Sequence, residues 1–423
     1  MNRITTFAAA CTVSISAIAH AQDLAPSAPP QENPVILVGA TAHTISGETI
    51  ENALVSINEG KIGMVGRADE IMPRISLSEN TQIIDLSGKH IYPGLIDSVT
   101  ILGLEEVSAV RATRDHNEVG DMTPEVRAYV AVNPDSTVIP VARTNGILTA
   151  GVAVTGGTIP GRASVISTDG WTTEDLAISR DAGLIISLND NNIDRLDKIF
   201  AQALAYSQAH NEIDQRLEAI TTVLPDQSDN NEQNPVFMRA NTYEQITKSI
   251  NWALKHNLKP IIVGGRDAYL CTDLLTSTNT PVIIGGTYTF PKRADAPYDA
   301  RYTLPKKLND AGVRWSLTMS SRFGHERNLP DAAAIAVAHG LSQEAALHGI
   351  TLGAAQILGV DHLIGSIEPG KYATLIVTDG NILETTTLVE AAYIQGRSID
   401  LTNKQTELRD TYREKYRQLN MID

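Results

Sequence analysis

The chain has 423 residues, of which 42% are hydrophobic and 20% are charged, as in an ordinary globular protein with enough length for a large core. Acidic residues outnumber basic residues by 49 to 34, which gives a formal net charge of −15. This balance argues against nucleic acid as a partner, because phosphate binding needs a basic face.

The N-terminus has the pattern of an export signal. A short basic start, MNR, precedes an apolar run of small residues that ends in the cleavage pattern AHA. The run is short for a membrane span, and Cys11 lies too early in it to be a lipidated cysteine. We therefore predict a cleaved signal peptide over residues 1–21, and a periplasmic or secreted protein without a membrane span. Cys271 is then the only mature cysteine, which excludes an internal disulfide.

The two ends of the mature chain have similar patterns. Residues 22–33 are rich in proline and serine, which predicts an extended linker. Short alternating runs separated by turn signals predict antiparallel strands over residues 34–90 and again over residues 365–402. A polar helix is predicted over residues 403–423. Neither strand region is large enough to be stable alone, so we expect both to form one small β-sandwich domain.

Residues 91–364 have a different pattern, in which apolar runs alternate with amphipathic stretches. Such alternation predicts parallel strands joined by right-handed helical crossovers. The runs are IYPGLID, ILTAGVAV, GLIISL, PVFMRA, KPIIVGG, PVIIGG and VRWSLT, and GRASVIS is either a hairpin or the missing eighth strand. Thr242 and Gln245 form a capping-box pattern at the start of the clearest helix. The predicted fold class is α/β, a (β/α)8 TIM-like barrel inserted into the β-sandwich domain.

Motifs at both ends of the predicted barrel are informative. EGKIGMVG and IIDLSGKHIYPGLID stand at its start, and GLSQEAALHGITLGAAQILGV and GSIEPGKYATLIVTDG stand at its end. Together they resemble the amidohydrolase superfamily, in particular its imidazolonepropionase-like exported members, over about residues 35–400. The resemblance implies one or two divalent metals, such as zinc, at the C-terminal ends of the strands. There a metal-activated water hydrolyses amide or related C–N bonds.

The positions that hold metal ligands in that family carry other residue types here. The family has His-x-His after PGLID, a histidine in the strand matching PVFMRA, another in the next strand, and an aspartate after VRWSLT. In this chain these positions hold Val99 and Ile101, Arg239, Gly264 or Gly265, and Met319. Apolar side chains and a protonated guanidinium do not bind a divalent cation. We therefore predict a degenerate metal site, no metal cofactor, and loss of metal-dependent catalysis.

Arginines follow the same strand ends. If the barrel closes, fixed guanidinium charge stands where the metal charge stood and can hold a carboxylate bidentately. The predicted substrate-binding residues are Arg239, Arg266 and Arg322, and no catalytic residue is predicted. Alternatively, some of these arginines pair with neighbouring acids, for instance Asp267 or Glu326, and only stabilise the fold.

Two functions follow from these patterns. By resemblance, the protein hydrolyses non-peptide C–N bonds such as those of amides and cyclic amides. Alternatively, it is a catalytically inactive periplasmic binding or partner subunit, which recognises a small anionic ligand or pairs with an intact amidohydrolase relative. A homo-oligomer is a further possible assembly. The loss of ligands on separate strands favours the second function.

Overall fold

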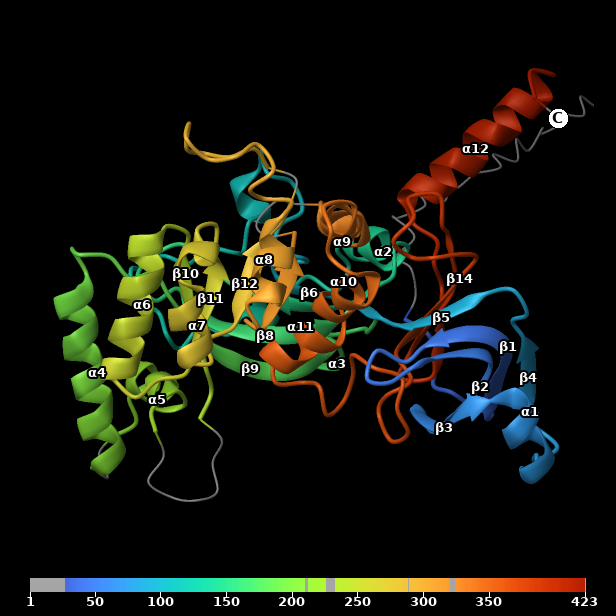
Figure 1. Cartoon of the computed structure of the whole chain (residues 1–423), viewed down its shortest axis with the longest axis horizontal. Coiled ribbons are helices and arrows are strands. Elements are labelled where there is room, and N and C mark those ends of the chain that lie inside the picture. The colour runs from blue at the N-terminus through green and yellow to red at the C-terminus, as the bar shows by residue number, and fades with distance from the viewer. Residues whose placement is uncertain (1–26, 210–211, 226–232, 288, 320–323, 423) are drawn as a thin grey trace, which may run out of the picture.

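The computed structural model describes residues 27–209, 212–225, 233–287, 289–319 and 324–422, and in these residues it contains two sheets of eight strands each (Figure 1). The predicted signal peptide, residues 1–21, lies outside the described residues. Within the described part of the chain, no helix has the length and apolar character needed to cross a membrane.

The first sheet, here called the end sheet, is built from both ends of the chain. Its order is β16-β15-β14-β5-β1-β2-β3, and β4 pairs with β1. The two ends meet between β5 and β14, where Tyr92 pairs with Ile376. Leu37 and Leu375, which are far apart in the sequence, share one core. The strands are β1 Val35–His43, β2 Thr49–Asn58, β3 Lys61–Arg67, β4 Gln82–Asp85, β5 His90–Pro93, β14 Leu375–Thr378, β15 Val389–Ile394 and β16 Arg397–Ile399.

Hydrogen bonds join all strands of the end sheet into one continuous sheet. Both ends of the chain therefore contribute to one β domain. The division of that domain into the two stacked layers of a β-sandwich is not confirmed, because the pairing does not separate its strands into two sheets.

The second sheet forms a nearly closed barrel in the order β13-β12-β11-β10-β9-β8-β7-β6. Neighbouring strands are parallel except at β8, which runs antiparallel to both β7 and β9. The edge strands β6 and β13 meet through side chains, since the Ser98 hydroxyl donates to the Ser316 hydroxyl oxygen at 2.8 Å. The strands are β6 Leu95–Thr100, β7 Ile147–Val152, β8 Gly161–Ser167, β9 Ala177–Ile186, β10 Val236–Ala240, β11 Pro260–Gly264, β12 Val282–Gly285 and β13 Trp315–Thr318.

β8 corresponds to GRASVIS and changes the predicted barrel. The segment is both a member of a hairpin and the eighth strand, so the sequence alternatives do not exclude each other. Because two antiparallel neighbours can follow each other through short connections, this part of the barrel lacks the regular βα crossovers that the (β/α)8 prediction assumes. Each apolar run predicted as a strand overlaps a strand of the structure, and IYPGLID is divided between β5 and β6.

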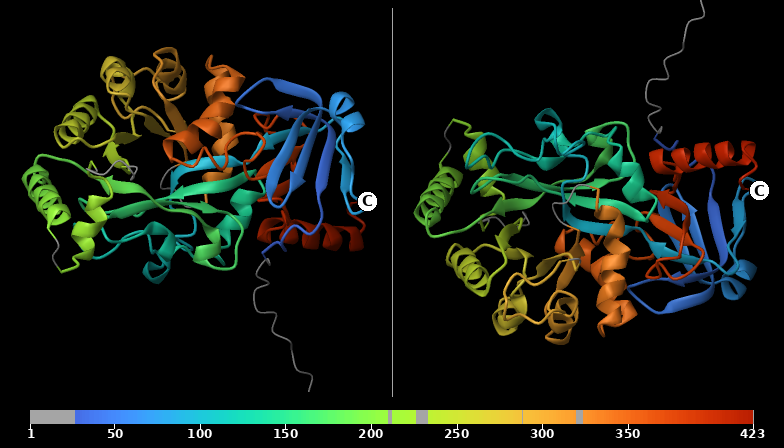
Figure 2. Two further views of the ribbon diagram at one scale, coloured as in Figure 1. Left: turned by 90° about the horizontal axis from the view of Figure 1, so that it is seen from below. Right: turned by 90° about the horizontal axis from the view of Figure 1, so that it is seen from above.

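Helices cover the other part of the barrel, and Figure 2 shows those between β10 and β13 along one side of the sheet. The capping box of α6 is confirmed, because the Thr242 side chain accepts from the Gln245 N–H and the Gln245 side chain accepts from the Thr242 N–H. The α-helices are α1 Ala68–Ile71, α2 Val138–Arg143, α3 Thr173–Leu176, α4 Ile193–Gln208, α5 Gln215–Thr221, α6 Tyr243–Lys255, α7 Thr272–Ser277, α8 Leu304–Asp310, α9 Leu329–Ala338, α10 Gln343–Gly349, α11 Leu352–Ile357 and α12 Lys404–Gln418. The 3-10 helices are Met72–Arg74, Arg111–Thr113, Ala128–Ala131, Ala268–Leu270 and Glu326–Asn328.

The chain passes from the end sheet to the barrel at Gly94. β5 ends at Pro93 in the first sheet, and β6 begins at Leu95 in the second. A Cβ atom at Gly94 would lie 2.8 Å from the Cβ of Leu148 on β7, so a larger residue would push the first barrel strands apart. The chain thus leaves the end sheet and enters the barrel shortly after the boundary between residues 90 and 91 that the sequence pattern indicates.

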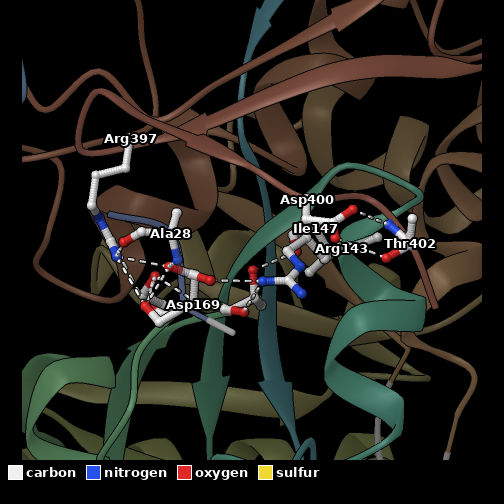
Figure 3. A network of polar contacts seen from close by, with 10 residues as sticks. Ala28, Arg143, Ile147, Asp169, Arg397, Asp400 and Thr402 are labelled. Carbon is white, nitrogen blue, oxygen red and sulfur yellow. Dashed lines mark hydrogen bonds and ion pairs between the residues drawn. The ribbon is translucent and has the colours of Figure 1, made fainter. Parts of the chain in front are cut away.

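Asp169 joins the barrel to the end sheet (Figure 3). One carboxylate oxygen accepts from Arg143 of α2 at 2.9 Å, and the other accepts from Arg397 of β16 at 2.7 Å. The second oxygen also accepts from the Ser27 hydroxyl at 3.0 Å and the Ala28 N–H at 3.2 Å. The Asp169 side chain is only 3% exposed. A buried charge is tolerated when it is paired and hydrogen-bonded, as here.

We expect Asp169→Ala to lower the free energy of unfolding by about 3 kcal/mol, because it leaves the buried Arg143 guanidinium without its ion-pair partner. Urea unfolding followed by circular dichroism measures the change. Asp410→Ala is the matched control, since its ion pair with Arg409 is exposed on both sides and contributes little. Equal midpoints for the two variants would contradict the assigned role of Asp169.

Candidate functional site

The candidate site lies at the barrel mouth, defined here as the end of the barrel at which β6, β10, β11, β12 and β13 finish. These strands are parallel, so their C-terminal ends and the loops that follow them meet at one end of the sheet. Functional groups of barrel enzymes gather at this end, because each loop there is free to carry side chains toward a common centre.

At the end of β6, the structure places apolar side chains in the positions of the His-x-His pair. Val99 is partly buried and packs against the main core, and Ile101 is 4% exposed within that core. Met319, just after β13, is also buried in this core, with 7% of its surface exposed. The three side chains thus contribute to packing of the barrel.

Arg239 of β10 reaches across the barrel. Its Nη2 donates to the carbonyl oxygen of Val154 at 2.9 Å, and Val154 follows β7, three strands away in the sheet. Burial lowers the pKa of the Arg239 guanidinium. Among the described residues, no acidic side chain forms an ion pair with it. One part of the guanidinium therefore has a backbone acceptor, and its charge has no carboxylate partner in the described chain.

Arg266 lies at the neighbouring strand end, where it forms an ion pair. Its Nε lies 3.4 Å from a carboxylate oxygen of Asp267, which is 6% exposed. The backbone N–H of Asp267 donates to the carbonyl oxygen of Asn241 at 2.9 Å, and this bond ties the loop to the end of β10. Arg266 therefore forms the alternative interaction that the sequence suggested, an ion pair with a neighbouring acid.

The remaining sequence predictions at the mouth have different outcomes. Arg322 lies outside the described residues. Glu326, the other acid considered as a partner for an arginine, is 1% exposed and accepts a hydrogen bond from the Thr100 hydroxyl at 2.6 Å. Its second oxygen, Oε2, is buried without a hydrogen-bond partner. Arg239 and Arg266 lie on adjacent strand ends, and no hydrogen bond joins their side chains in the described structure.

A buried carboxyl lies beside Glu326. Asp97 of β6 is 0% exposed, and its Oδ1 lies 2.5 Å from the Thr318 hydroxyl oxygen, which lies 2.5 Å from the carbonyl oxygen of Val99. A hydroxyl has one proton to donate, so it can serve both contacts when the Asp97 carboxyl is protonated and donates to Thr318. Burial raises the pKa of Asp97 to about 8, with a further rise from Glu326 against opposing hydrogen bonds from Thr318 and Met319.

Burial also raises the pKa of the Glu326 carboxyl. Two neighbouring carboxyls in an apolar surrounding cannot both be charged without a large desolvation penalty. At neutral pH we therefore infer that Asp97 keeps its proton and acts as a hydrogen-bond donor. This carboxyl pair closes the seam between β6 and β13.

Sequence reasoning missed this pair and one further residue. Asp97 was part of the PGLID motif, and the pattern carried no sign that Glu326 turns inward toward Thr100. Arg301, on the connection between β12 and α8, is 8% exposed, and its Nε and Nη1 have no hydrogen-bond partner. The sequence around Arg301 has the composition of an ordinary loop. Only the burial of its side chain in the structure distinguishes it.

Comparisons with known proteins agree with this architecture. The model of the amidohydrolase family matches residues 265–406. An amidohydrolase from Thermotoga maritima MSB8 superposes with a TM-score of 0.77 at 24% sequence identity, over 86% of this chain and 99% of that chain. This match and the shared fold support the assignment of the chain to the amidohydrolase superfamily. No curated protein matches the sequence.

More distant structures share the amidohydrolase fold. An adenosine deaminase from Xanthomonas campestris with bound zinc has a TM-score of 0.54 at 16% identity, over 93% of this chain and 100% of that chain. A Xaa-Pro dipeptidase with bound methionine in the active site has a TM-score of 0.52 at 14% identity, over 87% of this chain and 100% of that chain. At such low identities the likeness concerns the fold alone.

The described residues at the barrel mouth do not fit the divalent metal of the amidohydrolase family. The described residues contain no group of three or more His, Cys, Asp or Glu side chains that could hold a metal ion. At the family's positions, Val99 and Ile101 lack donor atoms, and Arg239 carries a positive charge that would repel a cation. No chemical step through a metal is therefore assigned to these residues.

We expect the wild type to lose stability relative to Asp97→Asn as the pH rises from 5 to 8. The free energy of unfolding of the variant minus that of the wild type should therefore increase over this range. In the folded protein Asp97 stays protonated up to about pH 8, whereas in the unfolded chain it ionises near its ordinary pKa of 3.8. The contribution of Asp97 to folding stability is therefore fully present below pH 3.8, and it is lost as the pH rises toward 8. One proton corresponds to about 1.4 kcal/mol per pH unit at most.

Urea titrations of both proteins at pH 5, 6.5 and 8 measure this difference. Asparagine retains an oxygen acceptor and offers N–H donors in place of the carboxyl proton, so it tests the charge with little change of shape. A difference that stays constant over this range would show that Asp97 is ionised in the folded state.

Proposed function

We propose that the barrel mouth binds a small carboxylate-bearing molecule through Arg239, and that it does so without metal-dependent hydrolysis. The observation that carries this proposal is the Arg239 guanidinium, which occupies a family ligand position and has no acidic partner in the described chain. We further propose that the protein acts after export to the periplasm or the medium, with the AHA pattern as its cleavage site.

The chemistry of the mouth supports binding over metal-assisted hydrolysis. A divalent metal would polarise a carbonyl and lower the pKa of its bound water from about 15.7 to about 7. Val99, Ile101 and Met319 supply packing at the positions from which such a metal would be held. Arg239 supplies instead a permanent charge and planar donors, which suit a carboxylate.

Arg239 also has a defined orientation. Its bond to the Val154 carbonyl fixes one edge of the guanidinium, which leaves its other donors for a ligand. Burial strengthens the interaction with an anion, because the surrounding dielectric is lower than that of water. A single well-placed arginine at a strand end can thus replace the anchoring role of a metal, although not its role in activating water.

We expect small carboxylates or dipeptides to raise the melting temperature of the purified full chain, and Arg239→Met to abolish the shift. A ligand that binds only the folded state stabilises it by RT ln(1 + [L]/Kd), or about 2.7 kcal/mol at 100 times Kd. Arg327→Met is the control, because Arg327 is exposed and lines a separate cavity next to α2 and α12. Circular dichroism checks that both variants are folded.

Elemental analysis of the same preparation tests the second half of the proposal. We expect far less than one zinc, manganese, iron or nickel ion per chain. One ion per chain, retained through gel filtration, would overturn the assignment of a degenerate metal site. Absence of any carboxylate effect on the wild type would instead remove the binding function.

A second candidate is a partner subunit, which pairs with an intact amidohydrolase relative or with a copy of itself. The observation that favours it is α12, which projects from the end sheet and has no buried residue among those described (Figure 1). Leu408, Tyr412 and Tyr416 are exposed on it at helical spacing. We expect light scattering to give a mass above that of one chain for the mature wild type, and Leu408→Ser with Tyr412→Ser to reduce it to that of a monomer.

A further inference from the structure

Arg301 is a buried cation whose charge is not matched in the described structure. It lies on the connection between β12 and α8 at the barrel mouth, and 8% of its surface is exposed. Nε and Nη1 are shielded from solvent and have no hydrogen-bond partner, and Arg301 forms no ion pair with any described residue. An unpaired charge in such a position costs several kcal/mol, so it indicates that a counter-charge belongs there.

Asp267, the acid that acts electrostatically on Arg301, is already engaged by other arginines. Asp267 lies against Arg266, with 3.4 Å between Nε and Oδ1, and 3.7 Å from Nη1 of Arg293. Asp295 accepts two hydrogen bonds from Arg293 at 3.1 Å each. Asp267 thus has Arg266 and Arg293 as its ion-pair partners, and it forms no ion pair with Arg301 in the described structure.

The charged groups around Arg301 also leave its positive charge unbalanced. Burial lowers the pKa of its guanidinium, Arg266 lowers it further, and Asp267 acts in the opposite direction. Arg301 and Arg266 carry positive charge and Asp267 carries negative charge, so these three groups have a net positive charge, which favours an anion. One carboxylate would balance the one unpaired guanidinium.

Arg301 and Arg239 belong to the same end of the barrel. The loop that carries Arg266 and Asp267 is tied to the end of β10 by the bonds from the Gly265 N–H to Ala240 and from the Asp267 N–H to Asn241. Arg239 immediately precedes Ala240 on β10. Two guanidiniums without an acidic partner in the described residues therefore belong to one mouth: the partly buried Arg239 on β10 and the buried Arg301 in the connection after β12, two strands further along the sheet.

From this arrangement we infer that the ligand is a dianion with two carboxylates, one held by Arg239 and the other by Arg301. The inference rests on the proposed binding function and adds the class of ligand to it. A dicarboxylate satisfies both guanidiniums with one molecule, and its connecting chain spans the mouth between them. A monocarboxylate leaves one of the two buried charges unbalanced.

The test measures the affinity of the mature full chain for a homologous series of diacids, namely malonate, succinate, glutarate and adipate. Each is compared with the monocarboxylate of the same chain length, and sodium chloride keeps the ionic strength constant, since screening weakens charge interactions. We expect at least one diacid to bind about 30-fold or more tightly than its monocarboxylate. This ratio corresponds to the second charge-assisted contact, worth about 2 kcal/mol or more.

Variants assign the two ends of the diacid. Arg301→Met is expected to reduce the affinity for the best diacid to that of the monocarboxylate and to leave monocarboxylate binding at Arg239 unchanged. Arg293→Met is the matched control, because Arg293 is 42% exposed and already paired with Asp295, and it should retain the preference for diacids. Arg301→Met should also raise the melting temperature of the unliganded protein by about 1–3 °C, since it removes an unpaired buried charge.

The outcomes separate this inference from the function on which it rests. If monocarboxylates and diacids bind equally well to the wild type and to Arg301→Met, the dianion inference is wrong and carboxylate binding stands. If neither class binds the wild type, the proposed function fails. A melting temperature that falls in Arg301→Met, with the preference for diacids retained, would show that Arg301 only stabilises the fold.

Discussion

A guanidinium that leaves water needs a counter-charge or a set of acceptors, and this requirement organises the arginines of the chain. At Asp169 it is met within the protein, because the carboxylate lies between Arg143 and Arg397 and joins the barrel to the end sheet. At the barrel mouth it is met only in part, since Arg239 has a carbonyl acceptor and Arg301 has no partner for two of its nitrogens. The paired arginines join the barrel to the end sheet, and the arginines without an acidic partner in the described residues are those on which the proposed ligand site rests.

At the positions compared with the metal ligands of the amidohydrolase family, the described residues are not His, Cys, Asp or Glu. At the end of β6, Ile101 belongs to the core and Val99 packs against it. The neighbouring Asp97 is buried as a proton-bearing carboxyl that bonds to Thr318 and closes the seam to β13. Positive charge is carried by arginines at the ends of β10 and in the loop after β12. A fixed cation of this kind can orient an anion but cannot activate water as a bound metal does.

Much of the fold could be predicted from the sequence, because its signals are local. Apolar runs identified the strands of the barrel, and Thr242 with Gln245 identified the start of α6. The antiparallel direction of β8 was only one of two alternatives, since an apolar run such as GRASVIS does not state the direction of its neighbours. The β-sandwich was inferred from the number of strands, and the pairing of β14 with β5 instead produces one continuous sheet.

The sequence by itself determined the residue types at the mouth: which positions lack metal donors, and that arginines stand near the strand ends. Only the tertiary structure decided which of them are paired. Arg266 meets Asp267, Glu326 turns toward Thr100, and Nε and Nη1 of Arg301 have no hydrogen-bond partner in the described part of the chain. The reason is physical. A residue type states which interactions are possible, whereas pairing and burial depend on contacts between segments far apart in the chain, and burial decides how strongly an unpaired charge demands a ligand.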